Sequence, residues 1–177
     1  LVVITSDHGE EFGERGGFGH RGFLYDEFVR VPLIVEGTAV PRGRVDRRLA
    51  SSIDIVPTIL RIANLVTEAP LEGRDLFSSQ APEAVFSQFE NKRYAIRTRD
   101  WKLIANQEPR SLELFDLRTD SRERNNVAAR FPDEARALEE RLWRWRAHCP
   151  SLKSLRSPDV EMSEEAIEQL RALGYVE

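Results

Sequence analysis

Cysteine and methionine are almost absent from this sequence, which has one of each among its 177 residues. Because Cys149 is the single cysteine, the chain forms no intramolecular disulfide. The cysteine count does not decide whether the protein works in an oxidising or a reducing compartment. No apolar run approaches the roughly 20 residues that a membrane-spanning helix needs. Lys and Arg number 26 against 30 Asp and Glu, so the net charge of -4 lacks the basic excess typical of nucleic-acid binding.

The residues that are present fit a globular protein, with 41% hydrophobic and 32% charged side chains. A chain of this length buries one core and leaves room for a small satellite domain. Leu1 lies inside a strand-like run and is not a start methionine. We therefore expect these residues to be the carboxyl-terminal part of a longer protein, with any signal peptide upstream.

The chain opens with an apolar, β-branched run over residues 1–5, which is typical of a strand covered on both faces in a parallel sheet. Asp7 and His8 follow it directly, at the edge where open α/β sheets bind ligands. A glycine-rich loop comes next. A short helix is then predicted over residues 22–30 and a second buried strand over residues 33–35.

The segment SSIDIVPTILRIANL, residues 51–65, predicts a helix. Asp54 is a good N-cap, and Pro57 falls in the first turn, where its missing N–H does no harm. Asn64 lies near the predicted end of this helix. The apolar face that we expect to pack on the sheet consists of Ile53, Val56, Leu60 and Ala63.

A loop rich in Pro, Gly and Ser over residues 67–82 separates two compositional regimes. The segments beyond it, AVFSQFE, RYAIRT, WKLIA and LELFDL, predict an antiparallel meander. A helix beginning at Phe131-Pro132-Asp133 should cover that sheet with the stripe Ala135, Leu138, Leu142 and Trp145. The predicted fold is therefore α/β in three parts: residues 1–80, residues 81–149, and a tail over 150–177 with a terminal helix capped by Ser163 and stopped at Gly174.

Asp7 and His8 are the candidate metal ligands. A carboxylate suits a hard cation, and an imidazole adds a nitrogen ligand that zinc or manganese accepts more readily than calcium does. A structural alternative stays open, in which Asp7 caps the following turn and His8 is a satisfied polar residue at a strand end. Ser6 cannot complete a catalytic triad with these two neighbours, because adjacent residues on an extended strand point to opposite faces.

Several other residues are interpreted as structural. Trp101, Trp143 and Trp145 are expected to pack in a core, since no basic stripe accompanies them. The pair Glu10-Glu11 is interpreted as solvated loop charge, and residues 118–124 as an exposed turn that Asn125-Asn126 continues.

The run TSDHGEEFGERGGFGHRGFLYDEFVRVPLIVEG closely resembles the distal metal-binding segment of the sulfatases, within the alkaline-phosphatase-like superfamily. SIDIVPTILRIANL, EGRDL, the pair YAIRTRDWKLI and LELFDLRTDSRERNNVA, and the closing LRALGYVE resemble the same family in the same order. The resemblance implies that residues 1–80 end an alkaline-phosphatase-like sheet domain and that residues 81–149 form a small antiparallel sheet subdomain with a covering helix.

By this resemblance Asp7 matches the metal-binding aspartate, and His8 matches the next ligand position, which is Asn in many calcium sulfatases and His in related phosphonate or phosphate hydrolases. Calcium is the metal implied for a sulfatase, and manganese or zinc for a phosphodiesterase-like relative. His20 matches a Lys or His position that contacts the transferred anionic group; a surface histidine on a glycine-rich loop is the alternative. Arg21 is a second candidate for substrate binding, or a solvated loop-end arginine.

The family nucleophile is a formylglycine made from Cys or Ser in a Cys/Ser-x-Pro-x-Arg context, and it is expected upstream of this chain. Cys149-Pro150-Ser151 lacks the arginine at the matching spacing, so Cys149 is interpreted as structural or incidental. Two or more further metal ligands, carboxylates among them, are also expected upstream. We therefore expect the chain alone to be inactive, because it contains neither the nucleophile nor a complete set of metal ligands. The intact protein is expected to hydrolyse small-molecule or glycan sulfate esters, without nucleic acid as a partner, in a periplasmic, secreted or membrane-associated location.

Two alternatives to sulfate-ester hydrolysis stay open. The first keeps the fold and changes the substrate to a phosphate or phosphonate ester, which the Asp7-His8 pair permits equally well. The second is a catalytically inactive binding module of the same fold.

Overall fold

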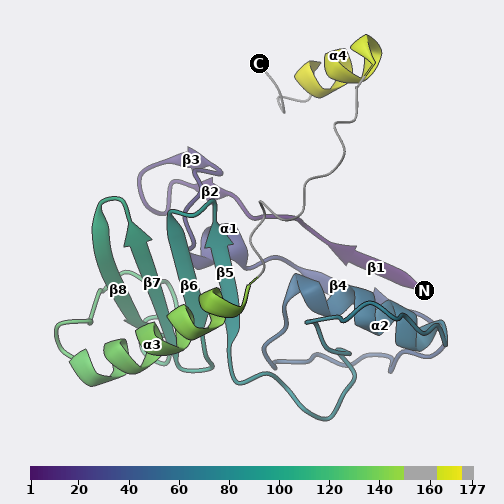
Figure 1. The fold of residues 1–177 in the computed structure, drawn as a ribbon, viewed down its shortest axis with the longest axis horizontal. Helices are drawn as coiled ribbons and strands as arrows, with labels where there is room; N and C mark the ends of the chain where they lie inside the picture. The colour runs from purple at the N-terminus through teal and green to yellow at the C-terminus, as the bar shows by residue number, and fades with distance from the viewer. Residues whose placement is uncertain (150–162, 173–177) are drawn as a thin grey trace. The chain divides into compact units, whose positions relative to one another are not determined.

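The computed structural model of the chain describes residues 1–149 and 163–172. The chain divides into two compact units, Leu1–Trp145 and Arg146–Glu177, which are described separately below. Every strand that the described residues form belongs to the first unit (Figure 1). Among the described residues, none of the helices combines the length and apolar character needed to cross a bilayer.

Strand β1 (Val2–Thr5) pairs antiparallel with β4 (Leu33–Glu36) in a two-stranded ribbon. The two predicted strands therefore exist, but the prediction that they are buried in a parallel sheet is wrong for this chain. Val2 and Ile4 are 53% and 54% exposed, and Ile34 is 56% exposed. A ribbon of two strands has few neighbours to cover its faces, so an apolar run alone does not make a strand buried.

A short hairpin follows β1 and consists of β2 (Glu11–Phe12) and β3 (Phe18–Gly19). The helix predicted over residues 22–30 is shorter, because α1 covers only Asp26–Val29. Gly9 brings the chain against this helix: its N–H donates to the carbonyl of Phe28 at 2.8 Å. A Cβ at Gly9 would lie 2.1 Å from the carbonyl oxygen of Glu27, so glycine is required at this crossing.

The helix predicted over residues 51–65 is present as a 3-10 turn, η1 (Ser52–Asp54), followed by α2 (Ile55–Ile62). Asn64 adopts a φ of 53° just after it, as expected of a helix stop. The predicted packing of its apolar face on the sheet is wrong, since Ile53 and Val56 are 55% and 52% exposed. Hydrogen bonds fix the start of this helix: the Asp54 carboxylate accepts the N–H of Ser51 at 2.9 Å and the N–H of Arg74 at 2.8 Å.

Thr58 is the buried contact of α2, and its hydroxyl is used twice. It donates to the carbonyl of Asp54 at 2.6 Å and accepts the N–H of Leu76 at 2.9 Å. The isosteric substitution Thr58→Val should lower the free energy of unfolding by about 1–3 kcal/mol, because it leaves the half-buried N–H of Leu76 without its acceptor. Urea denaturation measures this, with the exposed Thr38→Val as the matched control. Equal losses in the two variants would contradict the role given to the hydroxyl.

The predicted meander is confirmed. Its strands β5 (Val85–Phe89), β6 (Arg93–Arg97), β7 (Trp101–Gln107) and β8 (Arg110–Asp116) form one antiparallel sheet in the order β5-β6-β7-β8. Helix α3 (Pro132–His148) covers one face, as Figure 1 shows. The core between them is made by Tyr94, Ile96, Leu103, Ala105, Leu114, Ala135, Leu138 and Leu142.

The three tryptophans pack around this core, as predicted. Trp145 stacks on Phe86 with ring centroids 4.7 Å apart. Trp143 meets Tyr94, and Trp101 meets Phe131, both edge to face at 5.2 Å. Such aromatic contacts add to the area that each ring buries.

The opposite face of the meander is covered by the segment that contains α1. Leu24 packs there with Ala95, Ile104 and Phe115 in a second buried cluster. The chain just after the β2–β3 hairpin is therefore fixed directly against the sheet, which brings the first 30 residues and the meander into contact.

In the second unit, helix α4 (Glu164–Ala172) begins where predicted. The Ser163 hydroxyl accepts the N–H of Ala166 at 3.3 Å, which confirms the N-cap. The predicted stop at Gly174 lies outside the described residues, and the predicted boundaries at residues 80 and 149 stay predictions.

Candidate functional site

Pairing of the β2–β3 hairpin brings Glu10 beside His20. Glu11 is opposite Gly19 and Phe12 is opposite Phe18. At the open end of this pairing the His20 Nδ1 atom lies 2.9 Å from the Glu10 Oε1 atom. A glycine-rich segment that was predicted as a loop is therefore a hairpin that joins an acid to an imidazole.

His8 completes a cluster with this pair. Its ring lies 4.4 Å from the His20 ring, centroid to centroid, and its Nδ1 atom lies 4.0 Å from Glu10 Oε1. One ligand atom from each of His8, Glu10 and His20 lies within 4.8 Å of the others. Two imidazoles and one carboxylate are a donor set that zinc or manganese accepts, whereas calcium favours oxygen ligands.

Glu10 is the member of this cluster that the sequence analysis missed. Its side chain is 38% exposed, so solvent reaches it as predicted, but it also contacts both histidines, which the interpretation as loop charge did not foresee. The signal that could have found it is the spacing of residues 10 and 20 around a turn rich in glycine, which fits a hairpin as well as a loop.

Asp7 lies beside the cluster and is 75% exposed. Its Oδ1 atom accepts the backbone N–H of His8 at 3.0 Å, and its Oδ2 atom lies 3.7 Å from His8 Nε2. The hydrogen bond from the His8 backbone keeps the pKa of the Asp7 carboxyl below its usual range. Asp7 is thus an ionised, accessible carboxylate next to the histidine with which it was predicted to bind metal. The Ser6 hydroxyl donates to the backbone carbonyl of His8 at 2.7 Å.

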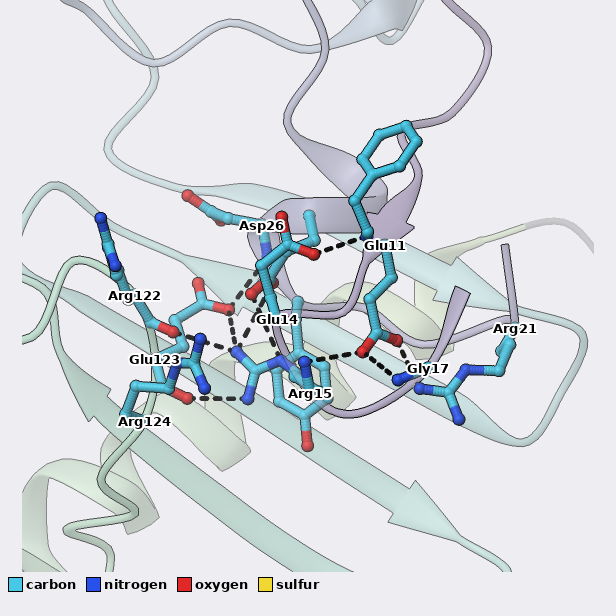
Figure 2. A network of polar contacts seen from close by, with 12 residues as sticks. Glu11, Glu14, Arg15, Gly17, Arg21, Asp26, Arg122, Glu123 and Arg124 are labelled. Carbon is cyan, nitrogen blue, oxygen red and sulfur yellow. Dashed lines mark hydrogen bonds and ion pairs between the residues drawn. The ribbon is translucent and has the colours of Figure 1, made fainter. Parts of the chain in front are cut away.

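Glu11 holds the interior of the hairpin. It is fully buried, and its Oε1 atom accepts the backbone N–H of Arg15 at 2.7 Å and of Gly17 at 3.0 Å. The Arg21 guanidinium contacts its other oxygen, and this contact lowers the pKa of the Glu11 carboxyl (Figure 2). The expectation of a solvated Glu11 is wrong, because the tight turn leaves backbone N–H groups that need an acceptor inside it.

Arg21 was predicted as a second residue for substrate binding. The structure places its guanidinium on Glu11 and against Gly17, where an added Cβ would lie 2.3 Å from the guanidinium carbon. The side chain remains 43% exposed. Arg21 therefore has a structural partner, while His20 is the basic group that projects at the cluster with 66% exposure.

A buried group of charges lies between the α1 segment and the meander. Lys102 of β7 is 1% exposed, and its Nζ atom lies 2.9 Å from Asp26 Oδ1 and 2.8 Å from Glu123 Oε1. Arg97 of β6 donates to Asp26 at 2.8 Å. Glu123 is itself 1% exposed, so the prediction of an exposed turn over residues 118–124 is wrong at this position.

Burial and neighbouring charge act in opposite directions on these two acids. Burial raises the pKa of Glu123 to about 7, although Lys102 opposes the shift. Burial also acts to raise the pKa of Asp26, but the cations Lys102 and Arg97 outweigh it and hold that pKa below the usual range. Asp26 is therefore the firmly ionised acid, and Glu123 is the acid that titrates near neutrality.

Comparison with known proteins shows which family the chain matches. A family described as "N-sulphoglucosamine sulphohydrolase, C-terminal" matches residues 13–148. Arylsulfatase K of Bos taurus is 31% identical over 162 residues, which cover 80% of this chain and 30% of that protein. The uncharacterized sulfatase YidJ of Escherichia coli K12 is 31% identical over 157 residues, which cover 80% of this chain and 31% of the relative.

Two solved structures extend the comparison. BT4656, in complex with its substrate D-glucosamine-2-N,6-O-disulfate, has a TM-score of 0.64 at 28% identity and covers 82% of this chain and 33% of its own. The phosphonate monoester hydrolase of Agrobacterium radiobacter has a TM-score of 0.73 at 26% identity and covers 83% and 35%. The chain thus spans about a third of the length of these relatives.

The fold, an α/β arrangement with small antiparallel sheets and a covering helix, agrees with these two solved structures. The family match extends over well more than half of the chain and includes His20, Arg21 and the whole meander. The chain belongs to the sulfatases, as the carboxyl-terminal part defined by the N-sulphoglucosamine sulphohydrolase C-terminal family.

Proposed function

We propose that the polypeptide carrying this chain is a metal-dependent hydrolase of sulfate esters, with Asp7 and His8 as metal ligands and His20 as the group that contacts the transferred anion. Membership in the sulfatases supports the reaction class. The observation that carries the site assignment is the convergence of His8, Glu10 and His20 within 4.8 Å next to the accessible carboxylate of Asp7.

A bound divalent cation would polarise the ester oxygen and stabilise charge as the bond breaks. His20 is suited to neutralise oxygens that gain charge in the transition state, because its imidazole is exposed and a carboxylate holds its Nδ1 side at 2.9 Å. When both ring nitrogens carry a proton, Nδ1–H donates to Glu10 and Nε2–H can donate toward the ester. The family resemblance implies calcium, whereas the imidazole of His8 favours zinc or manganese.

The nucleophile is the part of this proposal that the chain does not supply. None of the 177 residues lies in the family's Cys/Ser-x-Pro-x-Arg context, and a formylglycine is expected upstream. We therefore expect the chain alone to bind metal without hydrolysing an ester. A sulfated sugar is the proposed substrate class, because the similar BT4656 structure holds D-glucosamine-2-N,6-O-disulfate.

Hydrolysis of a phosphate or phosphonate ester is the second candidate. The likeness to a phosphonate monoester hydrolase and the histidine at position 8 both favour it. The fold and the metal ligands would be the same, so comparing turnover of an aryl sulfate with that of an aryl phosphonate decides between the two.

The substitution Asp7→Ala tests the ligand assignment in the complete polypeptide. We expect metal affinity to fall by more than the roughly 10–100-fold seen when an outer-shell partner is lost, and aryl-sulfate turnover to fall with it. Metal content and turnover are measured beside His148→Ala, which removes the third histidine of the chain and should change neither. Equal metal occupancy in wild type and Asp7→Ala would exclude the ligand role, and metal binding without turnover of either ester would indicate a binding module.

A further inference from the structure

The hairpin that carries Glu10 and His20 is too small to hold its own geometry. Each of its strands has two residues, β2 (Glu11–Phe12) and β3 (Phe18–Gly19). Isolated two-stranded hairpins are marginally stable even when they are longer. The position of His20 must therefore depend on contacts outside the hairpin.

Arg15, at the turn of the hairpin, makes contacts in two directions. Its backbone N–H donates to Glu11 inside the turn at 2.7 Å. Its guanidinium leaves the hairpin and donates to the carbonyls of Glu123 at 3.0 Å and Arg122 at 3.1 Å. The same group lies 3.5 Å from the centroid of the Tyr25 ring. A planar group with five donors suits two carbonyls and an aromatic face together, and an ammonium group does not.

Glu123, which accepts a hydrogen bond from Arg15, is itself held by the meander. Glu123 adopts a φ of 54°, and its Oε2 atom accepts the N–H of Asp26 at 3.0 Å. Its Oε1 atom lies 2.8 Å from Lys102 of β7 and 3.8 Å from Arg97 of β6. Residue 15 is thus joined to residue 123, which is far along the chain, and residue 123 is joined to two central strands.

We propose that Arg15 and Glu123 are positioning residues of the site, which fix the hairpin bearing Glu10 and His20 to the meander β5–β8. The inference rests on the proposed function, because it assigns a role toward the same cluster. It also gives the meander β5–β8 a positioning role toward the cluster, although the ligand atoms of the cluster all come from residues 8–20.

Arg15→Met tests the proposal in the 177-residue chain, with Arg122→Met as the matched control. Arg122 contributes its backbone carbonyl to the link, and its side chain is exposed, so the control keeps the contact. Amide hydrogen exchange over residues 11–20 should become about tenfold faster in Arg15→Met, as expected from the loss of charge-assisted hydrogen bonds, and the amides of β6 and β7 should stay protected. Arg15→Lys should give an intermediate increase.

A side-chain readout separates positioning from a general loss of stability. The imidazole NMR signals of His8 and His20 should shift in Arg15→Met while those of His148 stay in place, and zinc affinity should fall about tenfold as the donors separate. Unchanged exchange over residues 11–20, or an equal rise over β6 and β7, would overturn the proposal. Failure of wild type to bind zinc would count against the proposed metal site alone, because hydrogen exchange and histidine signals report the link without any metal.

Discussion

Replacing Lys102 with methionine is expected to lower the free energy of unfolding by about 3–5 kcal/mol, because it removes the buried cation that lies between the carboxylates of Asp26 and Glu123. The side chain is 1% exposed, and its Nζ atom lies within 2.9 Å of both Asp26 and Glu123. Methionine keeps much of the volume of the lysine stem, so the loss reports charge and not a cavity. Urea denaturation followed by tryptophan fluorescence measures it.

Lys92→Met is the matched control for this substitution. Lys92 contacts Glu90 on the surface and is 55% exposed. Solvent screens such a pair, so the control should lose less than about 1 kcal/mol. If Lys102→Met were as mild as the control, the carboxylates around Lys102 would have to be neutral in the folded protein, and the buried ion cluster would not exist as described.

The buried cluster also shows where sequence reasoning reaches its limit. The meander and its covering helix could be predicted, because alternating and 3.6-residue patterns in the second half are local signals. Lys102 sits inside the apolar run WKLIA, and its partner Asp26 lies 76 residues away. Strand alternation places Lys102 on the face of β7 that carries Ile104, and that face is covered by the α1 segment. A local sequence pattern cannot predict that a segment near the start of the chain packs over this face of β7.

The candidate site was predictable to a similar extent. Asp7, His8 and His20 could be named from the motif, and the structure brings the two histidines together. Glu10 was missed because a strand of two residues gives no periodicity that could reveal its pairing with His20. The burial of β1 was overestimated for a related reason: an apolar run shows which residues can be covered, but not what covers them.

The stability of the folded chain is expected to fall as the pH rises from about 4.5 to about 7, through the titration of Glu123. Burial raises the pKa of this carboxyl from 4.5 to about 7, so the folded state holds a proton in this window that the unfolded state has released. Because the folded state binds more protons there, its stabilisation is complete at low pH and is lost as the pH passes through the folded pKa. The lowered pKa of Asp26 acts with the opposite sign but below its usual value of 3.8, outside this window.

Glu123→Gln isolates this contribution. The amide cannot titrate, so the difference in unfolding free energy between wild type and Glu123→Gln should change by on the order of 1–3 kcal/mol between about pH 5 and pH 8, with wild type losing more. All other ionisable groups are the same in the two proteins, so their contributions cancel in the difference. Parallel pH profiles would mean that Glu123 stays ionised beside Lys102. In that case Lys102 would overcome the cost of burial, and the cluster would contain two carboxylate charges at every pH in the window.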